Sequence, residues 1–333
     1  MASLSAANAQ FCFDVFKEIN YDDTTENLFF SPLSLLSTLA MVLFGARGNS
    51  ASQMEKVLHL NELTRTANSS NTRCEQDTRV HSHIQGFLSE IIKSSRSQVH
   101  MASGVFAEEA HPFLPKYLDC IEQLYKVKPQ NVDFKNNLEA TRTQINAWIE
   151  NKTKGDIKNL LLADCLTSSD QLVLVNAISF RGTWKYAFQK DQTTAMAFRL
   201  HEVTNEITYE KLSNWIGSAS MKDTAVVLYL PQLRLDGHHE DLASILTALG
   251  MTDAFDHSRA DLSGITAGGG LRVSKVIHKA MLEVTESDSE FTSTNQTSKV
   301  ENPEIFKVDQ PFLFFILHRE TKMILFYGRV CNP

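Results

Sequence analysis

Phe306-Lys-Val-Asp-Gln-Pro-Phe-Leu-Phe-Phe-Ile316 places an uninterrupted apolar run directly behind a proline near the end of the chain. A second apolar run, Met323–Val330, follows the polar segment His318–Lys322. Two apolar runs separated by a short polar segment predict a β-hairpin, whose strands would be Phe312–Leu317 and Met323–Val330.

Three earlier stretches also predict strands. Leu172–Phe180 has the sequence LVLVNAISF, a continuous apolar run with a single amide, which is typical of a strand covered on both faces. Ala225–Leu235 and Val273–Val284 are the other two candidates. These strands lie in the second half of the chain, so the larger sheets are expected to form from that half.

The first half has the periodicity of helices. Ala6–Ile19 places Phe11 and Val15 on one apolar face. Ser31 and Pro32 then suit the N-cap and first position of a helix whose apolar run reaches Phe44. Further helices are predicted at 50–58 and 138–153, and a polar inter-helix loop at 61–79. Helices first and buried strands later predict an α+β fold, with helices packed on large mixed or antiparallel sheets.

Composition excludes several classes of function. The 333 residues carry a net charge of −7, so no basic surface is expected for nucleic acid or an anionic membrane. No apolar run approaches the roughly 18 to 20 residues of a membrane span. Neither repeats nor a linker rich in glycine, proline or serine divides the chain, so residues 1–333 are expected to form one domain.

The cysteines and the first residues bear on location. The five cysteines are scattered and odd in number, which favours reduced thiols in a cytoplasmic protein over a disulfide framework. The opening residues lack the charged and apolar regions of a cleavable signal peptide. Export without a cleaved signal stays open, because sequons occur at Asn68, Asn151 and Asn295. The cysteines are Cys12, Cys74, Cys120, Cys165 and Cys331.

Four motifs, in order along the whole chain, resemble the serpin family. They are Asn27-Leu-Phe-Phe-Ser-Pro-Leu-Ser34 followed by Gly45-Ala-Arg-Gly48, Val175-Asn-Ala-Ile-Ser-Phe-Arg-Gly-Thr-Trp184, His278-Lys-Ala-Met-Leu-Glu-Val284, and the stretch Phe306–Ile316 quoted above. The opening residues 1–18 and the close on Cys331-Asn-Pro333 are most similar to megsin and bomapin, two members of the ovalbumin-type group, clade B.

The resemblance implies a monomeric scaffold that traps serine proteases as a suicide substrate, without cofactor, metal or catalytic residue of its own. A protease cleaves an exposed reactive-centre loop, here about 286–305, and the loop then inserts into the main sheet. By the same resemblance, Ser31, Ser34, Asn176 and His278 form the "shutter", a buried polar network that fixes two strands of that sheet. Trp184 matches a buried aromatic at the "breach", the top of the sheet.

The loop itself leaves two functions open. Its hinge would comprise Glu286, Ser287, Asp288, Ser289, Phe291 and Ser293, and its reactive bond would be Lys299–Val300. Lys299 would select a trypsin-like protease, because a basic side chain suits an acidic pocket. However, Asp288 replaces the hinge glycine of the family, and Phe291 would have to enter the core on insertion, where overpacking costs roughly 1 to 3 kcal/mol.

Loop length points the same way. The ten peptide steps from Ser289 to Lys299 span roughly 33 Å when extended, about one short turn less than in matching relatives. A non-inhibitory role in binding, storage or chaperone-like action is therefore the alternative to protease inhibition.

A second departure lies before the helix predicted at 207–215. Compared with the family, about 50 residues are missing between about 200 and 208, including strands of the second sheet. Their loss would leave 312–316 partly uncovered and a strand edge unpaired.

An enzyme is not expected. The chain has no nucleophile elbow, zinc-protease motif or phosphate-binding loop. His81-x-His83 and His238-His239 could contribute to a metal site, but no third ligand follows at a suitable spacing.

Overall fold

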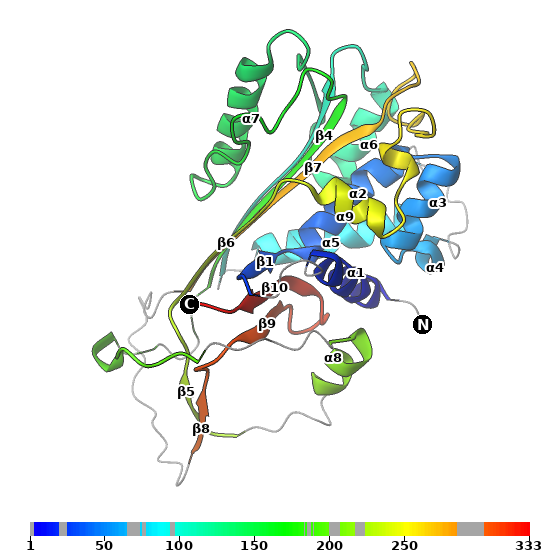
Figure 1. Cartoon of the computed structure of the whole chain (residues 1–333). Helices are drawn as coiled ribbons and strands as arrows, with labels where there is room; N and C mark the ends of the chain where they lie inside the picture. The colour runs from blue at the N-terminus through cyan, green and yellow to red at the C-terminus, as the bar shows by residue number, and fades with distance from the viewer. Residues whose placement is uncertain are drawn as a thin grey trace.

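The computed structural model describes residues 3–19, 25–64, 74, 78–93, 97–182, 184, 188, 190–199, 207–216, 224–284 and 303–333, and its elements are labelled in Figure 1.

The main sheet has five strands in the order β3-β2-β4-β7-β6. Their bounds are β2 Ser97–Glu108, β3 Gln130–Val132, β4 Leu172–Gly182, β6 Leu233–His239 and β7 Val273–Val284. The pairs β2–β3 and β4–β7 are parallel and the other two antiparallel, so the sheet is mixed, as predicted. The two long strands predicted from apolar runs are β4 and β7.

Helices cover both faces of this sheet. Figure 1 shows α7 on one face and the other long helices on the opposite face. Alternate residues of β4 belong to the two cores: Leu172 and Leu174 pack toward the larger helical cluster, whereas Val173 and Val175 pack toward α7. This confirms the expectation of a strand covered on both faces.

The helices are α1 Leu4–Ile19, α2 Pro32–Gly45, α3 Gly48–Val57, α4 Asn61–Thr64, α5 Thr78–Lys93, α6 Pro115–Tyr125, α7 Leu138–Lys152, α8 Tyr209–Trp215 and α9 Leu242–Ala248, with short 3-10 turns η1 Lys190–Gln192 and η2 Asp253–Phe255. In the described part of the chain, no helix has the length and apolarity to cross a membrane.

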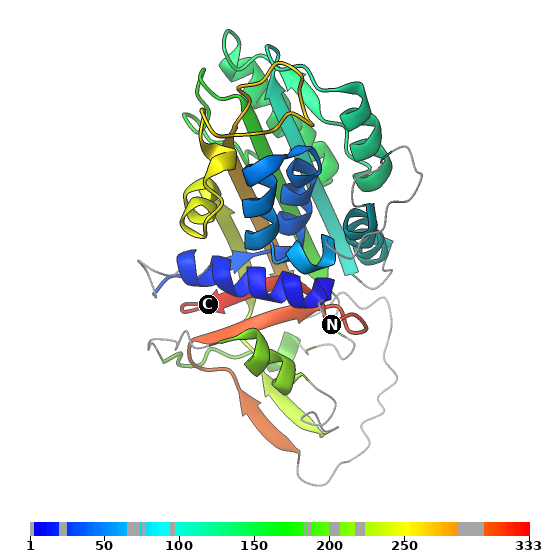
Figure 2. The same cartoon turned by 90° about the vertical axis from the view of Figure 1, so that its right-hand side faces the viewer.

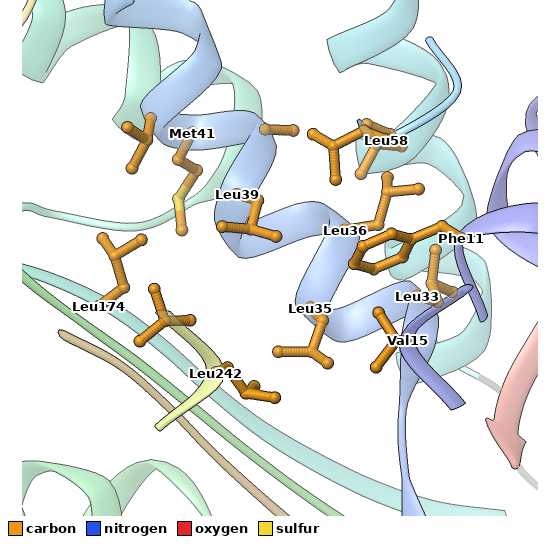
Figure 3. Packing of buried hydrophobic residues seen from close by; sticks show 14 of the residues in the cluster. Phe11, Val15, Leu33, Leu35, Leu36, Leu39, Met41, Leu58, Leu174 and Leu242 are labelled. Carbon is orange, nitrogen blue, oxygen red and sulfur yellow. The ribbon is translucent and has the colours of Figure 1, made fainter. Parts of the chain in front are cut away.

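Helix α2 lies at the centre of the larger core. Its N-cap is Ser31, whose hydroxyl accepts a hydrogen bond from the Ser34 N–H at 3.3 Å, and Pro32 occupies the first turn, as predicted. Because α2 is apolar on nearly every side, α1 and the sheet both pack against it. Figure 3 shows Leu35, Leu36 and Leu39 of α2 beside Phe11 and Val15 of α1.

A second, three-stranded antiparallel sheet lies below α1 (Figure 2). It consists of β1 (Leu28–Phe30), β10 (Ile324–Val330) and β9 (Phe312–Leu317), and it contains the predicted hairpin. β10 is fully buried, whereas β9 is the edge strand and each of its residues is only half-buried. The expectation that 312–316 would be partly uncovered is confirmed.

The strand predicted at Ala225–Leu235 is in fact two strands in different sheets. β5 (Val226–Tyr229) pairs in parallel with β8 (Glu304–Lys307), whereas β6 joins the main sheet. Leu230-Pro231 separates them, and proline lacks the N–H that a continuous strand would use. The periodicity of an apolar run cannot show that the chain changes sheets in its middle.

The expectation that the cysteines are reduced is wrong for two of the five. Cys74 and Cys120 form a disulfide across 46 residues, linking the segment before α5 to α6. Cys12 and Cys331 are free and buried, and Cys165 is free and half-buried. An odd count of cysteines does not determine pairing, and only the packing of α5 beside α6 brings these two together.

Candidate functional site at the seam of the main sheet

The seam is the line along which β4 and β7 lie side by side, and it crosses the centre of the main sheet. Ten residues of β4, Val173–Gly182, pair in unbroken register with Lys275–Val284 of β7, and Asn176 lies directly opposite His278. Both side chains are completely buried beneath the sheet, where the N-terminus of α2 meets it. The seam is therefore held by polar groups as well as by backbone hydrogen bonds.

Asn176 is the centre of this polar network. Its Oδ1 accepts hydrogen bonds from the Ser34 hydroxyl and from His278 Nδ1, each at 2.7 Å. Its Nδ2 donates to Thr38 Oγ1 and to Ser103 Oγ, each at 3.0 Å. The amide thus joins α2 to β2, β4 and β7 with both its donor and acceptor sides satisfied.

His278 has one defined tautomer. The Ser31 N–H donates to His278 Nε2 at 3.0 Å, so the ring proton is on Nδ1 and points at Asn176. Burial lowers the pKa of His278 well below its usual value, and the neighbouring His239 lowers it further. The imidazole is therefore neutral in the folded state, since a second proton on Nε2 would face the N–H of Ser31.

His239 of β6 stacks on His278 with ring centroids 6.2 Å apart and an interplanar angle of 7°. Its Nε2–H donates to the Phe29 carbonyl at 3.2 Å. Burial is the main cause that lowers the pKa of His239. Two neutral imidazoles thus lie at and beside the seam, and no acidic side chain among the described residues forms a hydrogen bond or ion pair with either ring.

The structure brings together all four residues of the predicted shutter and adds three that the sequence reasoning missed. Ser103 is the register partner of Asn176 on β2, a strand that was not predicted. Thr38 lies one helical turn after Ser34, and its spacing could have indicated it. His239 was considered only as half of a histidine pair, although it is the register partner of His278.

Arg181 lies at the end of the seam where both β4 and β7 terminate. Its Nε lies 3.0 Å from Glu283 of β7 and its second guanidinium nitrogen 2.9 Å from Asp156, which follows α7. Arg181 and Glu283 are register partners, so this ion pair crosses the seam. Asp156 also accepts hydrogen bonds from Ser179 at 2.6 Å and from His100 at 2.7 Å.

Burial by itself would raise the pKa of Asp156. The bonds from Ser179 and His100 and the charge of Arg181 outweigh that effect and keep the pKa below its usual value. A charged Asp156 therefore holds the segment after α7 against the sheet.

Trp184 contradicts its predicted role. It is 40% exposed, and the ring contact it makes is with Phe188, so it is not a buried aromatic at the top of the sheet. The strand β4 ends at Gly182, and Trp184 belongs to neither of the two hydrophobic cores. The predicted hinge residues Glu286 to Ser293 and the reactive bond Lys299–Val300 lie outside the described residues.

The histidine pairs do not converge on a metal site. His81 is buried on α5 against Tyr125, whereas His83 is exposed. His238 and His239 are neighbours on β6, so their side chains point to opposite faces. Within the described ranges, no group of three or more histidine, cysteine, aspartate or glutamate side chains could hold a metal ion.

Acid is expected to destabilise the fold through its buried imidazoles. Burial lowers the folded-state pKa of His278 and His239, and that of His81 to about 4, whereas an unfolded histidine titrates near 6.5. The unfolded state therefore binds more protons below pH 6.5. The free energy of unfolding is retained above this pH and falls below it by up to about 1.4 kcal/mol per pH unit for each histidine. Urea unfolding near neutrality and at about pH 5 measures this loss.

Two variants test the source of the acid effect. His239→Phe should reduce the slope of the free energy of unfolding against pH, because it removes one of the low-pKa groups; the reduction corresponds to up to one proton fewer taken up on unfolding. His83→Gln, at an exposed position, should leave the dependence unchanged. Equal free energies of unfolding for the unaltered protein at both pH values would contradict this prediction.

Comparisons with known proteins agree with this geometry. The family model described as "Serpin (serine protease inhibitor)" matches residues 6–205 and 198–333. Ovalbumin of Dromaius novaehollandiae is 36% identical over 388 aligned positions, and human Serpin B7 is 36% identical over 387, with 100% of each chain covered. The structure of uncleaved ovalbumin superposes with a TM-score of 0.86 at 31% identity, again over 100% of both chains.

A loop-inserted structure of a cleaved ovalbumin mutant also superposes, with a TM-score of 0.84 at 30% identity over 100% of both chains. The five-stranded sheet, its polar seam and these matches over the whole length lead to one conclusion. The chain belongs to the serpin family, in the group of ovalbumin and the clade B serpins.

Proposed function

We propose that this serpin inhibits a trypsin-like serine protease as a suicide substrate, which is cleaved at Lys299–Val300 and then inserts its loop between β4 and β7. The observation that carries this proposal is the seam, where two long parallel strands are adjacent and tied by a small polar network. As a serpin, the chain is not an enzyme, and the protease supplies the catalytic residues.

The topology of the seam supports insertion. β7 ends at Val284, directly before the predicted loop. A chain that turns back there runs antiparallel to β7, and because β4 is parallel to β7, it runs antiparallel to β4 as well. The inserted segment could therefore pair with both strands at once.

Insertion has to break contacts that cross the seam. These are the backbone hydrogen bonds between β4 and β7, the hydrogen bond between Asn176 and His278, and the ion pair between Arg181 and Glu283. Inhibition is a kinetic race between insertion and hydrolysis of the acyl-enzyme. A barrier higher by about 1.4 kcal/mol shifts that race tenfold toward hydrolysis.

A non-inhibitory role is the second candidate, and specific residues favour it. Asp288 replaces the hinge glycine, and Phe291 and Asn295 would be inward-facing after insertion. Such a serpin would be cut as an ordinary substrate, or would serve in binding, storage or a chaperone-like role.

We also propose that this chain lacks, between about 200 and 208, second-sheet strands that its relatives have. The alignment with ovalbumin of Dromaius novaehollandiae has 388 positions and the chain has 333 residues, so about 55 positions hold no residue of this chain. The two matched stretches of the family model meet at 198–205, which supports this place for the gap. The half-buried edge strand β9 is a further support.

Incubation with trypsin followed by SDS electrophoresis distinguishes the two candidates. An inhibitor gives a covalent adduct that survives SDS, because the acyl-enzyme is trapped. A substrate gives clean cleavage near Lys299 without adduct, which would overturn the inhibitory proposal. An inserted loop should also raise the melting temperature of the cleaved protein sharply, whereas a cleaved loop that stays outside should not.

We also propose where the protein is located. The Cys74–Cys120 disulfide supports export without a cleaved signal over a cytoplasmic location, because disulfides persist in oxidising compartments. The particular similarity to megsin and bomapin stays a prediction.

A further inference from the structure

The two-stranded ribbon β5–β8 is the most exposed apolar part of the described structure. Every residue of Val226–Tyr229 and Glu304–Lys307 is exposed, including Ile305 at 66% and Phe306 at 59%. Figures 1 and 2 both place the ribbon at the far end of the molecule from α2, beyond β9. A two-stranded ribbon is marginally stable in water, and large exposed apolar patches mark interaction surfaces.

One edge of β8 is unpaired within the described ranges. The Glu304 N–H donates to the Ala225 carbonyl at 3.0 Å, and the Val308 N–H donates to the Tyr229 carbonyl at 2.9 Å. Successive residues of a strand alternate in direction, so residues 304, 306 and 308 turn their backbone groups toward β5. Those of 305 and 307 point away, and no described residue bonds to them.

A second copy of the chain offers the same outward edge, and symmetry limits how two such edges can meet. In a two-fold antiparallel pair, outward residues must face outward residues, so the axis passes through residue 305, 306 or 307. An axis at Ile305 would place Lys307 opposite Pro303, which has no N–H to donate. An axis at Lys307 would place two lysines opposite each other.

The axis at Phe306 has neither defect. It pairs Ile305 with Lys307 of the second copy, and about four main-chain hydrogen bonds form. The two Phe306 rings then lie directly opposite at the two-fold axis, in a site without backbone hydrogen bonds, where cross-strand side chains are closest. Lys307 faces an apolar side chain, and its Nζ lies 5.3 Å from the centre of the Tyr229 ring.

We propose that two copies of this serpin associate through β8, in antiparallel register about Phe306, to form a continuous four-stranded sheet β5-β8-β8-β5. The unpaired edge of β8 in each copy forms hydrogen bonds with that of the other. Each two-stranded ribbon thereby becomes part of a four-stranded sheet, which is more stable in water. This goes beyond the proposed inhibitory function and differs from the monomer that the family resemblance implied.

Sedimentation velocity of the full chain from about 1 to about 100 µM tests the proposal. The unaltered protein should show a concentration-dependent dimer. Phe306→Lys and Phe306→Glu should each raise the dissociation constant at least about tenfold, because each places like charges opposite each other at the axis. An equimolar mixture of the two variants should recover the dimer, since opposite charges then meet.

A matched control keeps the result specific. Leu162→Lys introduces the same charge at an apolar residue that is 46% exposed and lies after α7, and it should leave the dimer unchanged. A protein that stays monomeric throughout, variants that change the dissociation constant less than about twofold, or a mixture without recovery would each overturn the proposal. Residue 306 is exposed, so circular dichroism of both variants should match the unaltered protein.

Discussion

Asn176→Ala is expected to reduce the free energy of unfolding by about 4 kcal/mol, because it leaves the buried His278 Nδ1–H without its acceptor and removes the amide that binds the buried hydroxyls of Ser34, Thr38 and Ser103. Each unsatisfied buried group costs about 1 to 3 kcal/mol. A loss of this size is a large part of the roughly 5 to 15 kcal/mol that stabilises most proteins. Urea unfolding followed by circular dichroism measures it.

The same substitution at an exposed asparagine is the control. Asn136→Ala removes one side-chain hydrogen bond to Asp133 at the surface, keeps the backbone one, and should change the free energy of unfolding by no more than about 0.5 kcal/mol. If Asn176→Ala also cost less than about 1 kcal/mol, the polar network would not hold the seam. The closed sheet would then depend on backbone pairing and apolar packing.

Loss of the Cys74–Cys120 disulfide is expected to have a similar effect, about 4 kcal/mol for a bridge that spans 46 residues. The bridge restricts the unfolded chain, whose conformational freedom rises when the bond is broken. Urea unfolding with and without dithiothreitol measures the difference.

Two variants separate this effect from the free thiols. Cys74→Ser combined with Cys120→Ser should show the full loss and no further response to the reductant. Cys165→Ser, which removes a half-buried free thiol, should still lose stability when dithiothreitol is added, as the unaltered protein does. An unaltered protein that unfolds at the same urea concentration in both conditions would show that the bridge does not stabilise the fold.

Local patterns were sufficient where one element contains its own signal. Ser31 and Pro32 predicted the start of α2 because an N-cap and a first-turn proline satisfy the backbone within a few residues. The run Leu172–Phe180 predicted β4 because a strand covered on both faces has no polar side. β2 was missed, since Ser97–Glu108 has polar residues among its apolar ones and lacks such a run.

The candidate site was predictable only in part. The resemblance indicated Ser31, Ser34, Asn176 and His278 together, but their hydrogen-bond partners Thr38 and Ser103 depend on how α2 and β2 lie against the seam. The ties from Arg181 to Asp156 and Glu283 likewise join segments that are far apart in the sequence. No local pattern contains the partner of such a contact.

By itself, the sequence determined the family, the mixed α+β architecture and the strands and helices with strong periodicity, because these depend on the spacing of apolar and capping residues along a short segment. Tertiary structure alone decided that Cys74 meets Cys120, that Trp184 is exposed and that the segment around Pro231 divides between two sheets. Those outcomes depend on which distant segments cover a side chain or an edge, and coverage is a property of the packed chain as a whole.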